Sequence, residues 1–174
     1  VKSKEQHMGE IVEVPVEELD EKWMSFALTQ AQTAAQADEV PVGALVVLDN
    51  QVVGLGRNCP IECSDPTGHA EIQAIRNACQ HQQNYRLPGA TLYITLEPCT
   101  MCLGAIIHSR IERIVFAATE PRAGAVVSAA ALNFSAFNHS LKWTKGVLED
   151  ESAQMLKAFF RARRKIKQTG ASNE

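Results

Sequence analysis

The 174-residue sequence contains no long apolar run and no excess of positive charge, and both absences narrow what the chain can be. No stretch approaches the roughly eighteen apolar residues that a membrane-spanning helix needs, and the start of the chain, Val1 to Glu10, is polar and unlike a signal peptide. We therefore expect a cytoplasmic protein with no membrane partner. The formal net charge is -3, so any nucleic acid would have to meet a local basic patch.

The sequence also lacks the signs of a secreted, disulfide-bonded domain. Its five cysteines are an odd number and no export signal accompanies them, so we expect reduced thiols that are open to metal binding or catalysis. Apolar residues make up 45% of the chain and charged residues 21%, which is typical of soluble globular proteins and unlike disordered or fibrous ones. A length of 174 residues suits one domain with one core.

Three regions follow one another along the chain. Residues 1–20 are charged and contain Pro15, and we expect them to form a flexible or loosely docked arm. Residues 21–168 form the expected folded domain, and residues 169–174 a disordered tail. Within the domain, β-branched apolar runs alternate with segments of helical spacing, which implies at least one parallel strand connection. The sequence therefore predicts an α/β fold of three α/β/α layers, with a mixed sheet of about five strands and helices on both faces.

The expected elements can be placed by residue range. We expect strands over residues 42–48, 52–55, 91–96, 111–118 and 141–147, and helices from residue 21 and over residues 69–78, 100–108 and 149–167. Asp49 and Asn50 join the first two strands as turn residues, so these strands form a hairpin, which we expect at the centre of the sheet. The first helix should pack on the sheet through one apolar face, which contains Trp23, Phe26, Ala27, Ala31 and Ala34.

Two short motifs carry the chemistry, namely H-A-E at residues 69–71 and P-C-T-M-C at residues 98–102. Cysteines three positions apart at the start of a helix lie on one side of it, and the positive helix end favours their thiolate form. One imidazole and two thiolates suit zinc, and three protein ligands, not four, are typical of a catalytic site with an open position for water. We therefore predict one zinc ion held by His69, Cys99 and Cys102.

Glu71 is the predicted proton carrier. A bound zinc ion lowers the pKa of its water toward neutrality, and a carboxylate beside that water can take and return the proton. Residues two apart on a regular helix point about 200° apart, so His69 and Glu71 cannot both serve one site from mid-helix. We therefore expect His69 at the irregular first turn of a helix, after a loop over residues 65–68, where entry residues keep non-helical torsion angles.

The same residue types also allow other interpretations. A C-x-x-C pair by itself is also typical of a redox pair or of half a structural zinc site, and only His69 and Glu71 in the right order favour a catalytic metal. The remaining cysteines lack a matching pattern and are expected to be semi-buried or incidental: Cys59, Cys63 and Cys79. The other histidines of the domain are expected to be structural or exposed, with His108 the one nearest the pocket: His81, His108 and His139.

Several blocks of sequence extend the pattern well beyond the metal ligands. From about Glu21 to Lys167 the chain contains, in this order, EVPVGALVV, GRN, DPTGHAEIQAIR, LEPCTMCLGAIIHSRI and FFRARR. The combination of H-x-E with P-C-x-x-C is the signature of zinc deaminases. With the surrounding blocks, the sequence resembles the bacterial tRNA-specific adenosine deaminases, which convert adenosine to inosine at the wobble position of an anticodon. Separate blocks in order are more specific than the zinc motif alone.

This resemblance implies a cytidine-deaminase-like fold, one zinc ion per subunit, a homodimer, and a tRNA anticodon stem-loop as substrate, with the target base turned into the pocket. It also implies that His69, Cys99 and Cys102 are the metal ligands and that Glu71 is the proton shuttle. Asn58 looks like the family's base-contacting asparagine, and a turn residue that follows a strand is the alternative interpretation.

Further substrate-binding residues are expected beside the ligands and on the C-terminal helix. Ala70 and Pro98 belong to the two metal motifs and are expected among them. Five cations crowd residues 161–167, and the preceding aromatic pair can offer a face to a splayed base. The alternative is that cations simply suit the end of a helix. We predict RNA contacts by Phe159, Arg161, Arg163 and Arg164.

One block departs from the family pattern. Where the family has an Asp, a Lys and a Thr before a Gly, residues 120–124 of this chain read Glu-Pro-Arg-Ala-Gly. The charge signs are kept, but a hydroxyl group is lost and the proline stiffens the loop. The RNA contacts of this loop are therefore left open, whereas the metal chemistry is unaffected.

The predicted activity is hydrolytic deamination at C6 of adenine, with no organic cofactor. A deaminase of free bases or nucleosides, or of cytosine in nucleic acid, would share every metal residue. A structural zinc module that binds RNA would close the metal with a fourth protein ligand and would have little use for Glu71. The basic C-terminal helix favours an RNA substrate over a free base.

Overall fold

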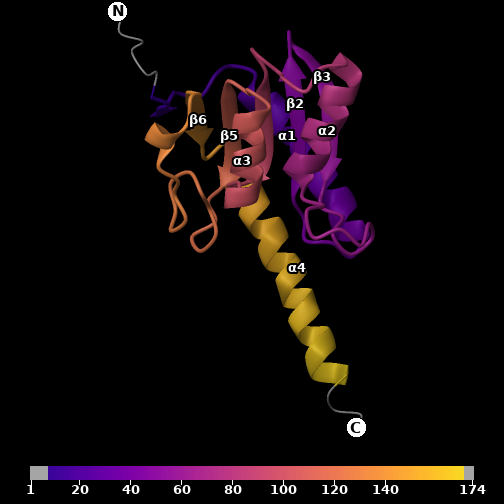
Figure 1. The fold of residues 1–174 in the computed structure, drawn as a ribbon. Helices are drawn as coiled ribbons and strands as arrows, with labels where there is room; N and C mark the ends of the chain where they lie inside the picture. The colour runs from indigo at the N-terminus through magenta and orange to yellow at the C-terminus, as the bar shows by residue number, and fades with distance from the viewer. Residues whose placement is uncertain (1–7, 171–174) are drawn as a thin grey trace, which may run out of the picture.

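A computed structural model describes the backbone of residues 8–170 and the side chains of residues 8–168. A six-stranded sheet lies between two layers of helices (Figure 1). Its elements in chain order are β1 (Ile11–Glu13), α1 (Asp20–Gln36), β2 (Gly43–Leu48), β3 (Gln51–Arg57), α2 (Ala70–Gln82), β4 (Thr91–Leu96), α3 (Thr100–His108), β5 (Arg113–Ala118), η1 (Phe134–Ala136), β6 (Leu141–Lys145) and α4 (Glu149–Gly170).

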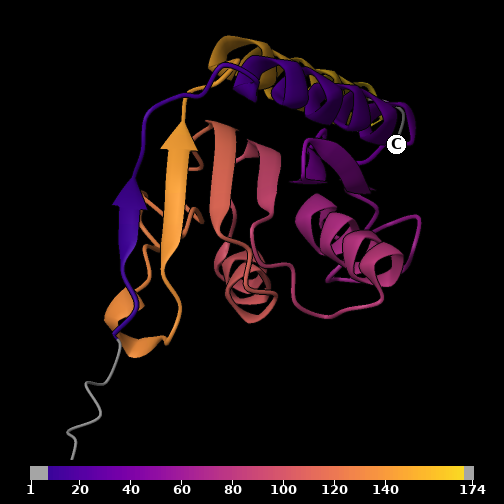
Figure 2. The same cartoon turned by 90° about the horizontal axis from the view of Figure 1, so that it is seen from above.

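The strands follow the order β1-β6-β5-β4-β2-β3 across the sheet. The pairs β4·β5, β5·β6 and β1·β6 are parallel, whereas β2 is antiparallel to both β3 and β4, so the sheet is mixed. In the view from above, α1 and α4 cover one face of the sheet and α2 and α3 cover the other (Figure 2). The predicted three-layer α/β/α architecture is confirmed.

The sheet has one strand more than predicted. Residues 11–13 pair in parallel with residues 141–143 of β6 at the edge of the sheet. This strand lies inside residues 1–20, where the sequence suggested a loosely docked arm, because three residues in a charged segment give no strand periodicity. At the other terminus α4 continues to Gly170, so the predicted tail of residues 169–174 begins within the helix, and residues 171–174 lie outside the described part.

The β2–β3 hairpin was predicted correctly, but its place in the sheet was wrong. Asp49 and Asn50 both have positive φ angles, 51° and 57°, as the two central residues of a type I′ turn require. The strand order makes β3 an edge strand, so the hairpin lies at the side of the sheet and not at its centre. Local turn chemistry specifies a hairpin but says nothing about which strands join it later.

The close packing of α2 against β3 depends on glycine. A Cβ atom at Gly56 would lie only 2.0 Å from the carbonyl oxygen of Ala70 and 2.5 Å from the backbone nitrogen of Ala74. Only a residue without a side chain lets the start of this helix approach the strand so closely. The backbone that carries residues 69–71 is therefore fixed directly against the sheet.

Both faces of the sheet bury apolar side chains, with one difference from the prediction for α1. Phe26 was expected on the buried face, but its side chain is 47% exposed and its ring lies against Trp23 with the centroids 6.0 Å apart. Met24 is fully buried instead. The cluster under α1 contains Trp23, Met24, Ala27, Leu45, Val47, Tyr93, Val115, Ala117 and Val147.

A buried ion pair fixes the start of α1 on the sheet. Arg113 donates hydrogen bonds of 2.8 and 2.7 Å to the two carboxylate oxygens of Asp20, and Tyr93 donates a third of 2.9 Å. Burial by itself raises the pKa of Asp20, but the hydrogen bonds from Arg113, Glu17 and Tyr93 and the charge of Arg113 together outweigh it, so the pKa lies below its usual value. No helix among residues 8–170 has the length and apolarity to cross a membrane.

Candidate active site

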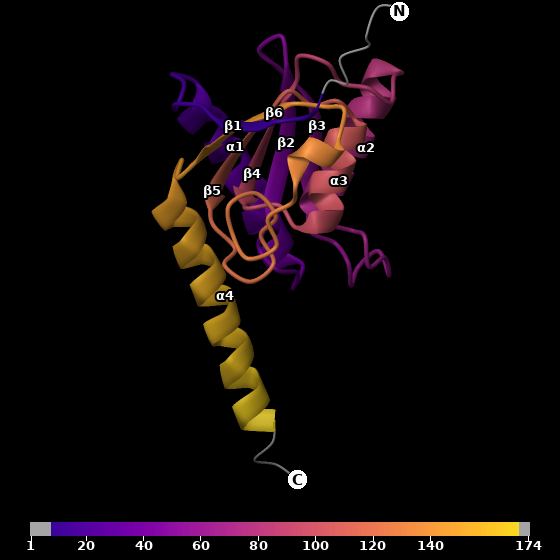
Figure 3. The ribbon, with the colours of Figure 1, turned by 60° about the vertical axis from the view of Figure 1, so that its left-hand side comes forward.

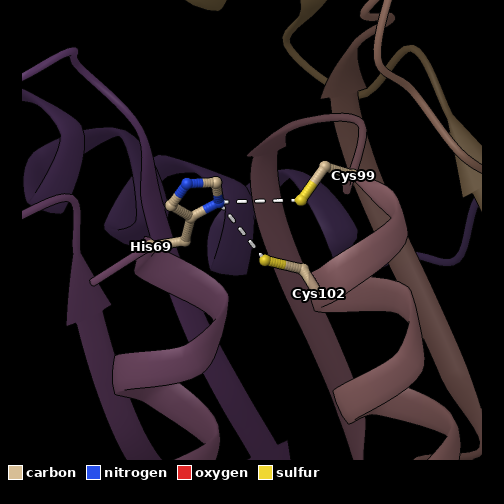
Figure 4. A group of neighbouring side chains, drawn as sticks. All are labelled: His69, Cys99 and Cys102. Carbon is tan, nitrogen blue, oxygen red and sulfur yellow. Dashed lines mark hydrogen bonds between the residues drawn. The ribbon is translucent and has the colours of Figure 1, made fainter. Parts of the chain in front are cut away.

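Two helix N-termini meet at one end of the sheet and carry the predicted metal ligands (Figure 4). His69 precedes the first residue of α2 and Cys99 precedes the first residue of α3, and both have extended backbone torsions. Cys102 follows in the first turn of α3 and is fully buried. The extended torsions of His69 satisfy the requirement that the H-A-E motif sit at an irregular helix entry. They let His69, just before α2, and Glu71, in the first turn of α2, approach one site.

The three ligand atoms lie as close together as a zinc site requires. His69 Nδ1 is 3.7 Å from Cys99 Sγ and 3.5 Å from Cys102 Sγ. Bonds of about 2.1 Å to nitrogen and 2.3 Å to sulfur at a tetrahedral angle predict an N–S separation of about 3.6 Å. All three atoms lie within 4.8 Å of one another, and no fourth protein ligand joins them among the described residues. The donor set therefore fits one zinc ion with an open coordination position.

The two cysteines have opposite protonation preferences. A hydrogen bond from Cys102 lowers the pKa of Cys99 to about 4, and a further bond to His69 acts in the same direction. The same contact with Cys99, together with burial, raises the pKa of Cys102. The hydrogen bond to Cys99 also raises the pKa of His69. Cys99 is therefore a thiolate at neutral pH, and Cys102 must release its proton when it binds a metal.

Glu71 lies in the first turn of α2 and is 4% exposed. Its burial raises its pKa to about 7. Interactions with the backbone and with His69 oppose the shift without cancelling it. The side chain is a buried carboxyl group next to the ligand cluster and is not itself a member of that cluster. This is the arrangement expected of a proton carrier.

A cavity of about 280 Å³ opens onto these residues. It is not the largest hollow on the surface, since one of about 460 Å³ lies between α1 and β3, but that one contains none of the predicted site residues. The chemistry, not the volume, therefore identifies the site. The lining residues of the 280 Å³ cavity are Val40, Val42, Asn58, Pro60, His69, Glu71, Leu96, Glu97, Cys99, Glu120 and Ala123.

Asn58 is placed at the cavity, whereas Ala70 and Pro98 lie behind its surface. The side-chain oxygen of Asn58 accepts a 3.0 Å hydrogen bond from the backbone N–H of Ala70, so it satisfies a donor at the start of α2. The Ala70 side chain is fully buried. The Pro98 carbonyl accepts a 2.9 Å hydrogen bond from the N–H of Ala125. Ala70 and Pro98 thus hold the walls of the site in place.

Comparison with known proteins agrees with this geometry. Residues 18–164 match the family model described as MafB19-like deaminase. A tRNA-specific adenosine deaminase of Haemophilus influenzae is 50% identical over 156 residues, which cover 86% of this chain and 88% of that relative. The chain belongs to the tRNA-specific adenosine deaminase family. The resemblance inferred from the sequence blocks is confirmed.

Solved structures place this deaminase in the same fold. A structure from work on A-to-I editing by tRNA:A34 deaminases is 44% identical, covers 78% of this chain and 99% of its own, and has a TM-score of 0.75. A guanine deaminase of Bacillus subtilis is 39% identical, covers 57% of this chain and 64% of its own, and has a TM-score of 0.55. Proteins named for different substrates, adenosine in tRNA and guanine, are therefore similar to this chain in fold.

The C-terminal helix of this deaminase extends beyond the sheet (Figures 1 and 3). Arg163 donates to the carbonyl oxygen of Asp38 and lies over the Phe159 ring, with its guanidinium carbon 5.0 Å from the ring centroid. Arg161 and Arg164 are exposed. Next to the cavity, and sharing Val40 with it, lies a second hollow of about 240 Å³. Its lining consists of Asp38, Glu39, Val40, Ile61, Phe159, Phe160, Arg163 and Lys167.

Sequence analysis missed one buried residue of the site. Glu97 is 3% exposed and lies two positions before Cys99, where the pattern suggested only the end of a strand. Burial raises its pKa, but hydrogen bonds from Ser128 and from backbone N–H groups hold the pKa below its usual value. Its hydrogen-bond donors come from an irregular segment far away in the sequence, so no residue spacing predicts these contacts.

None of the cysteines Cys59, Cys63 and Cys79 joins the ligand cluster.

Proposed function

We propose that this chain catalyses the zinc-dependent hydrolytic deamination of adenosine to inosine at the wobble position of a tRNA anticodon. The observation that carries the proposal is the cluster of His69, Cys99 and Cys102, which has a buried Glu71 beside it at the end of a cavity. The family of the chain supplies the substrate class, because its relatives are named for adenosine in tRNA.

One zinc ion per chain would be held by His69 Nδ1, Cys99 Sγ and Cys102 Sγ. When bound, the ion lowers the pKa of a water molecule enough to supply hydroxide at neutral pH. The positive ends of α2 and α3 both point at the ligands, and the pKa of Cys99 is already low without a metal, whereas Cys102 releases its proton on metal binding. The protein thereby prepares Cys99, but not Cys102, before a metal arrives.

Glu71 carries the protons of the reaction. Its carboxylate takes a proton from the attacking water and delivers it to the ring nitrogen N1 as the C6–O bond forms. It then moves the proton of the new C6 hydroxyl group to the amino group as the C6–N bond breaks, so adenosine and water become inosine and ammonia. Burial of Glu71 keeps bulk water from competing for these protons.

The substrate must leave its stack to reach these groups. The cavity is suited to one flipped base, and the Asn58 side chain, whose oxygen is committed to Ala70, can turn its amide N–H donors toward that base. The adjacent hollow on α4 supplies an aromatic pair and cations to the neighbouring nucleotides. Of the arginines predicted to contact RNA, Arg163 lines the hollow and Arg164 lies beside the face of α4 that lines it. Arg161 lies roughly 150° around the helix from that face.

A homodimer in the cytoplasm completes the proposal. The exposed side chains of Met101 on α3 and Val127 in the following loop offer apolar surface beside the site, as a subunit interface would require. The alternative function is a deaminase of free purines, which the likeness to a guanine deaminase supports. The basic, aromatic face of α4 favours the polynucleotide because a free base needs no phosphate contact.

Incubation with anticodon stem-loops decides between these functions. We expect nucleoside mass spectrometry to detect inosine at the wobble position. We expect no inosine in stem-loops whose adenosine has been moved to another loop position. Free adenosine, cytidine and guanine are the matched competitors under the same conditions. Comparable specific activity on any of these three would replace the proposed function by the free-substrate alternative.

A further inference from the structure

The Glu97 carboxylate holds a long loop of its own chain. One oxygen, Oε1, accepts hydrogen bonds from three consecutive backbone N–H groups, those of residues 126–128, at 3.1, 2.8 and 3.1 Å. The other, Oε2, accepts from the N–H of Glu120 at 3.0 Å and from the Ser128 hydroxyl at 2.5 Å. Successive N–H groups that converge on an anion form a nest. A neutral side chain cannot satisfy all five donors.

The loop is closed around this carboxylate. Residue Gly124 bridges to Cys99 in an isolated antiparallel pair, and its N–H donates to the Glu120 carbonyl at 2.8 Å. A Cβ atom at Gly124 would lie 2.3 Å from both Glu97 Cδ and Glu97 Oε2, so glycine is required by the proximity of Glu97. The loop belongs to the long β5–β6 connection, which bends out at the end of the sheet toward which α4 extends (Figure 3).

The same loop forms one side of the cavity. Glu120 and Ala123 of this loop line the cavity together with Asn58 and His69, which come from other parts of the chain. Glu97 itself also lines the cavity. The segment has no helix or strand of its own between β5 and η1, so backbone hydrogen bonding within regular structure does not fix it. The Glu97 carboxylate accepts hydrogen bonds from the backbone N–H groups at both ends of the loop over residues 120–128.

We propose that Glu97 is a positioning residue that fixes the loop over residues 120–128 as a rigid wall of the cavity and thereby sets which base the cavity accepts. A rigid wall excludes a purine with an added exocyclic group, whereas a mobile wall yields to it. The inference concerns selectivity for the base and rests on the proposed function only for the choice of substrate. Glu97 is not a member of the ligand cluster, and this role needs no contact with the reacting atoms.

Hydrogen exchange in Glu97→Gln tests the contact directly. The amide group can accept with its oxygen but not with its nitrogen, so one of the two sets of donors loses its acceptor. We expect exchange of the backbone N–H groups of Glu120 or of residues 126–128 to accelerate at least tenfold. The control is Glu112→Gln, the same chemical change at an exposed residue that pairs with Lys142 on the surface. Unchanged protection at all four N–H groups would overturn the proposal.

Selectivity gives a second readout that a general loss of stability would not move. Stem-loops with adenosine or 2-aminoadenosine at the target position are compared for kcat/KM with the parent and with Glu97→Gln. In Glu97→Gln we expect the zinc content to stay near one ion per chain and kcat/KM for the adenosine stem-loop to fall about tenfold. We expect the ratio of kcat/KM for adenosine to kcat/KM for 2-aminoadenosine to fall at least threefold. Equal losses on both substrates would show that Glu97 does not set selectivity.

Ser128→Ala keeps the proposal testable if Glu97→Gln does not fold. It removes only the 2.5 Å hydroxyl contact to Glu97 and leaves the carboxylate in place. We expect a smaller change of the same sign, about twofold to threefold, in both the exchange and the preference, and no change in either would contradict the proposal. If the parent deaminates no stem-loop, the proposed function fails, whereas the exchange measurement still decides whether Glu97 holds the loop.

Discussion

The side-chain oxygen of Asn58 accepts a 3.0 Å hydrogen bond from the backbone N–H of Ala70, which joins the end of β3 to the first turn of α2. The turn between His69 and Glu71 is thereby tied to the cavity wall. Asn58 was interpreted from sequence either as a base contact or as a turn residue, and its geometry combines a structural contact with a place in the cavity lining.

Two substitutions separate these two roles of Asn58. Asn58→Asp keeps an oxygen for the Ala70 N–H, so we expect near-parent stability, but it removes the amide donors and should lower kcat/KM at least tenfold. Asn58→Ala also loses the cap and should unfold about 1 kcal/mol more easily. Thermal denaturation and stem-loop kinetics check both values. Full activity in Asn58→Asp would leave the residue a structural role alone.

Replacing either ligand cysteine should remove the metal. We expect Cys99→Ser and Cys102→Ser to lose zinc and folded stability together, because metal binding is coupled to folding. Cys63→Ser is the matched control, since Cys63 is exposed and lies outside the cluster. Metal analysis by mass spectrometry gives the ratio of zinc to chain. Full occupancy in both ligand variants would reject the assignment of these residues.

Glu71→Ala should keep zinc and fold while turnover falls by about 10²–10⁴, the usual contribution of a general acid–base group. The reason is that Glu71 moves protons and lies outside the ligand set. Single-turnover inosine formation, with metal content measured on the same sample, makes the test. A residual rate within tenfold of the parent would assign the proton transfer to another group.

The cations of α4 should differ in importance according to the face on which they lie. We expect Arg164→Gln to weaken stem-loop binding and to lower the slope of log affinity against log salt by about 0.7–0.9, as the loss of one phosphate contact predicts. Arg161→Gln, on the far side of the helix, should have a smaller effect. Arg163→Gln should also reduce thermal stability, because Arg163 contacts Asp38 and Phe159. Equal affinities for all three variants and the parent at low salt would place the RNA path elsewhere.

The buried Asp20–Arg113 pair predicts a pH-dependent stability. The pKa of Asp20 is lower in the folded protein than in the unfolded chain, so its stabilising contribution is present above about pH 4 and is lost as the pH falls through the folded value. Asp20→Asn leaves the buried Arg113 charge with only the 3.5 Å contact to the exposed Glu17 carboxylate and should cost about 3–5 kcal/mol at pH 7. Denaturant titrations of the parent and the variant at pH 7 and at about pH 2 measure both effects. A variant as stable as the parent at pH 7 would falsify the role given to this pair.

Local signals explain what the sequence predicted well. The H-A-E and P-C-x-x-C motifs are contiguous, and each lies at a helix entry, so spacing alone indicates which side chains converge. The two positive-φ residues of the β2–β3 turn are equally local. In such cases the information sits within a few residues, where backbone geometry limits the outcomes.

Longer-range relationships explain what it could not predict. The role of Glu97 depends on hydrogen-bond donors that lie 23 to 31 positions later in the sequence, in a loop without periodicity. The three residues of β1 become a strand only because β6 offers them an edge. Phe26 has the spacing of a buried residue, yet it lies at the margin of the helix face and stays 47% exposed. Position in the assembled sheet decides each of these.

The convergence of two helix N-termini at the ligands has a consequence for the charge of the reaction centre. Each helix end contributes about half a positive charge, so the pair offsets roughly one negative charge. Two thiolates balance the charge of a divalent ion, so the helix ends offset the carboxylate of Glu71, while the charge of Glu97 is met by its own five hydrogen-bond donors. Under the proposed function, an uncharged nucleobase would enter beside groups whose charges are largely balanced, and the phosphates that carry it would stay outside near the cations of α4.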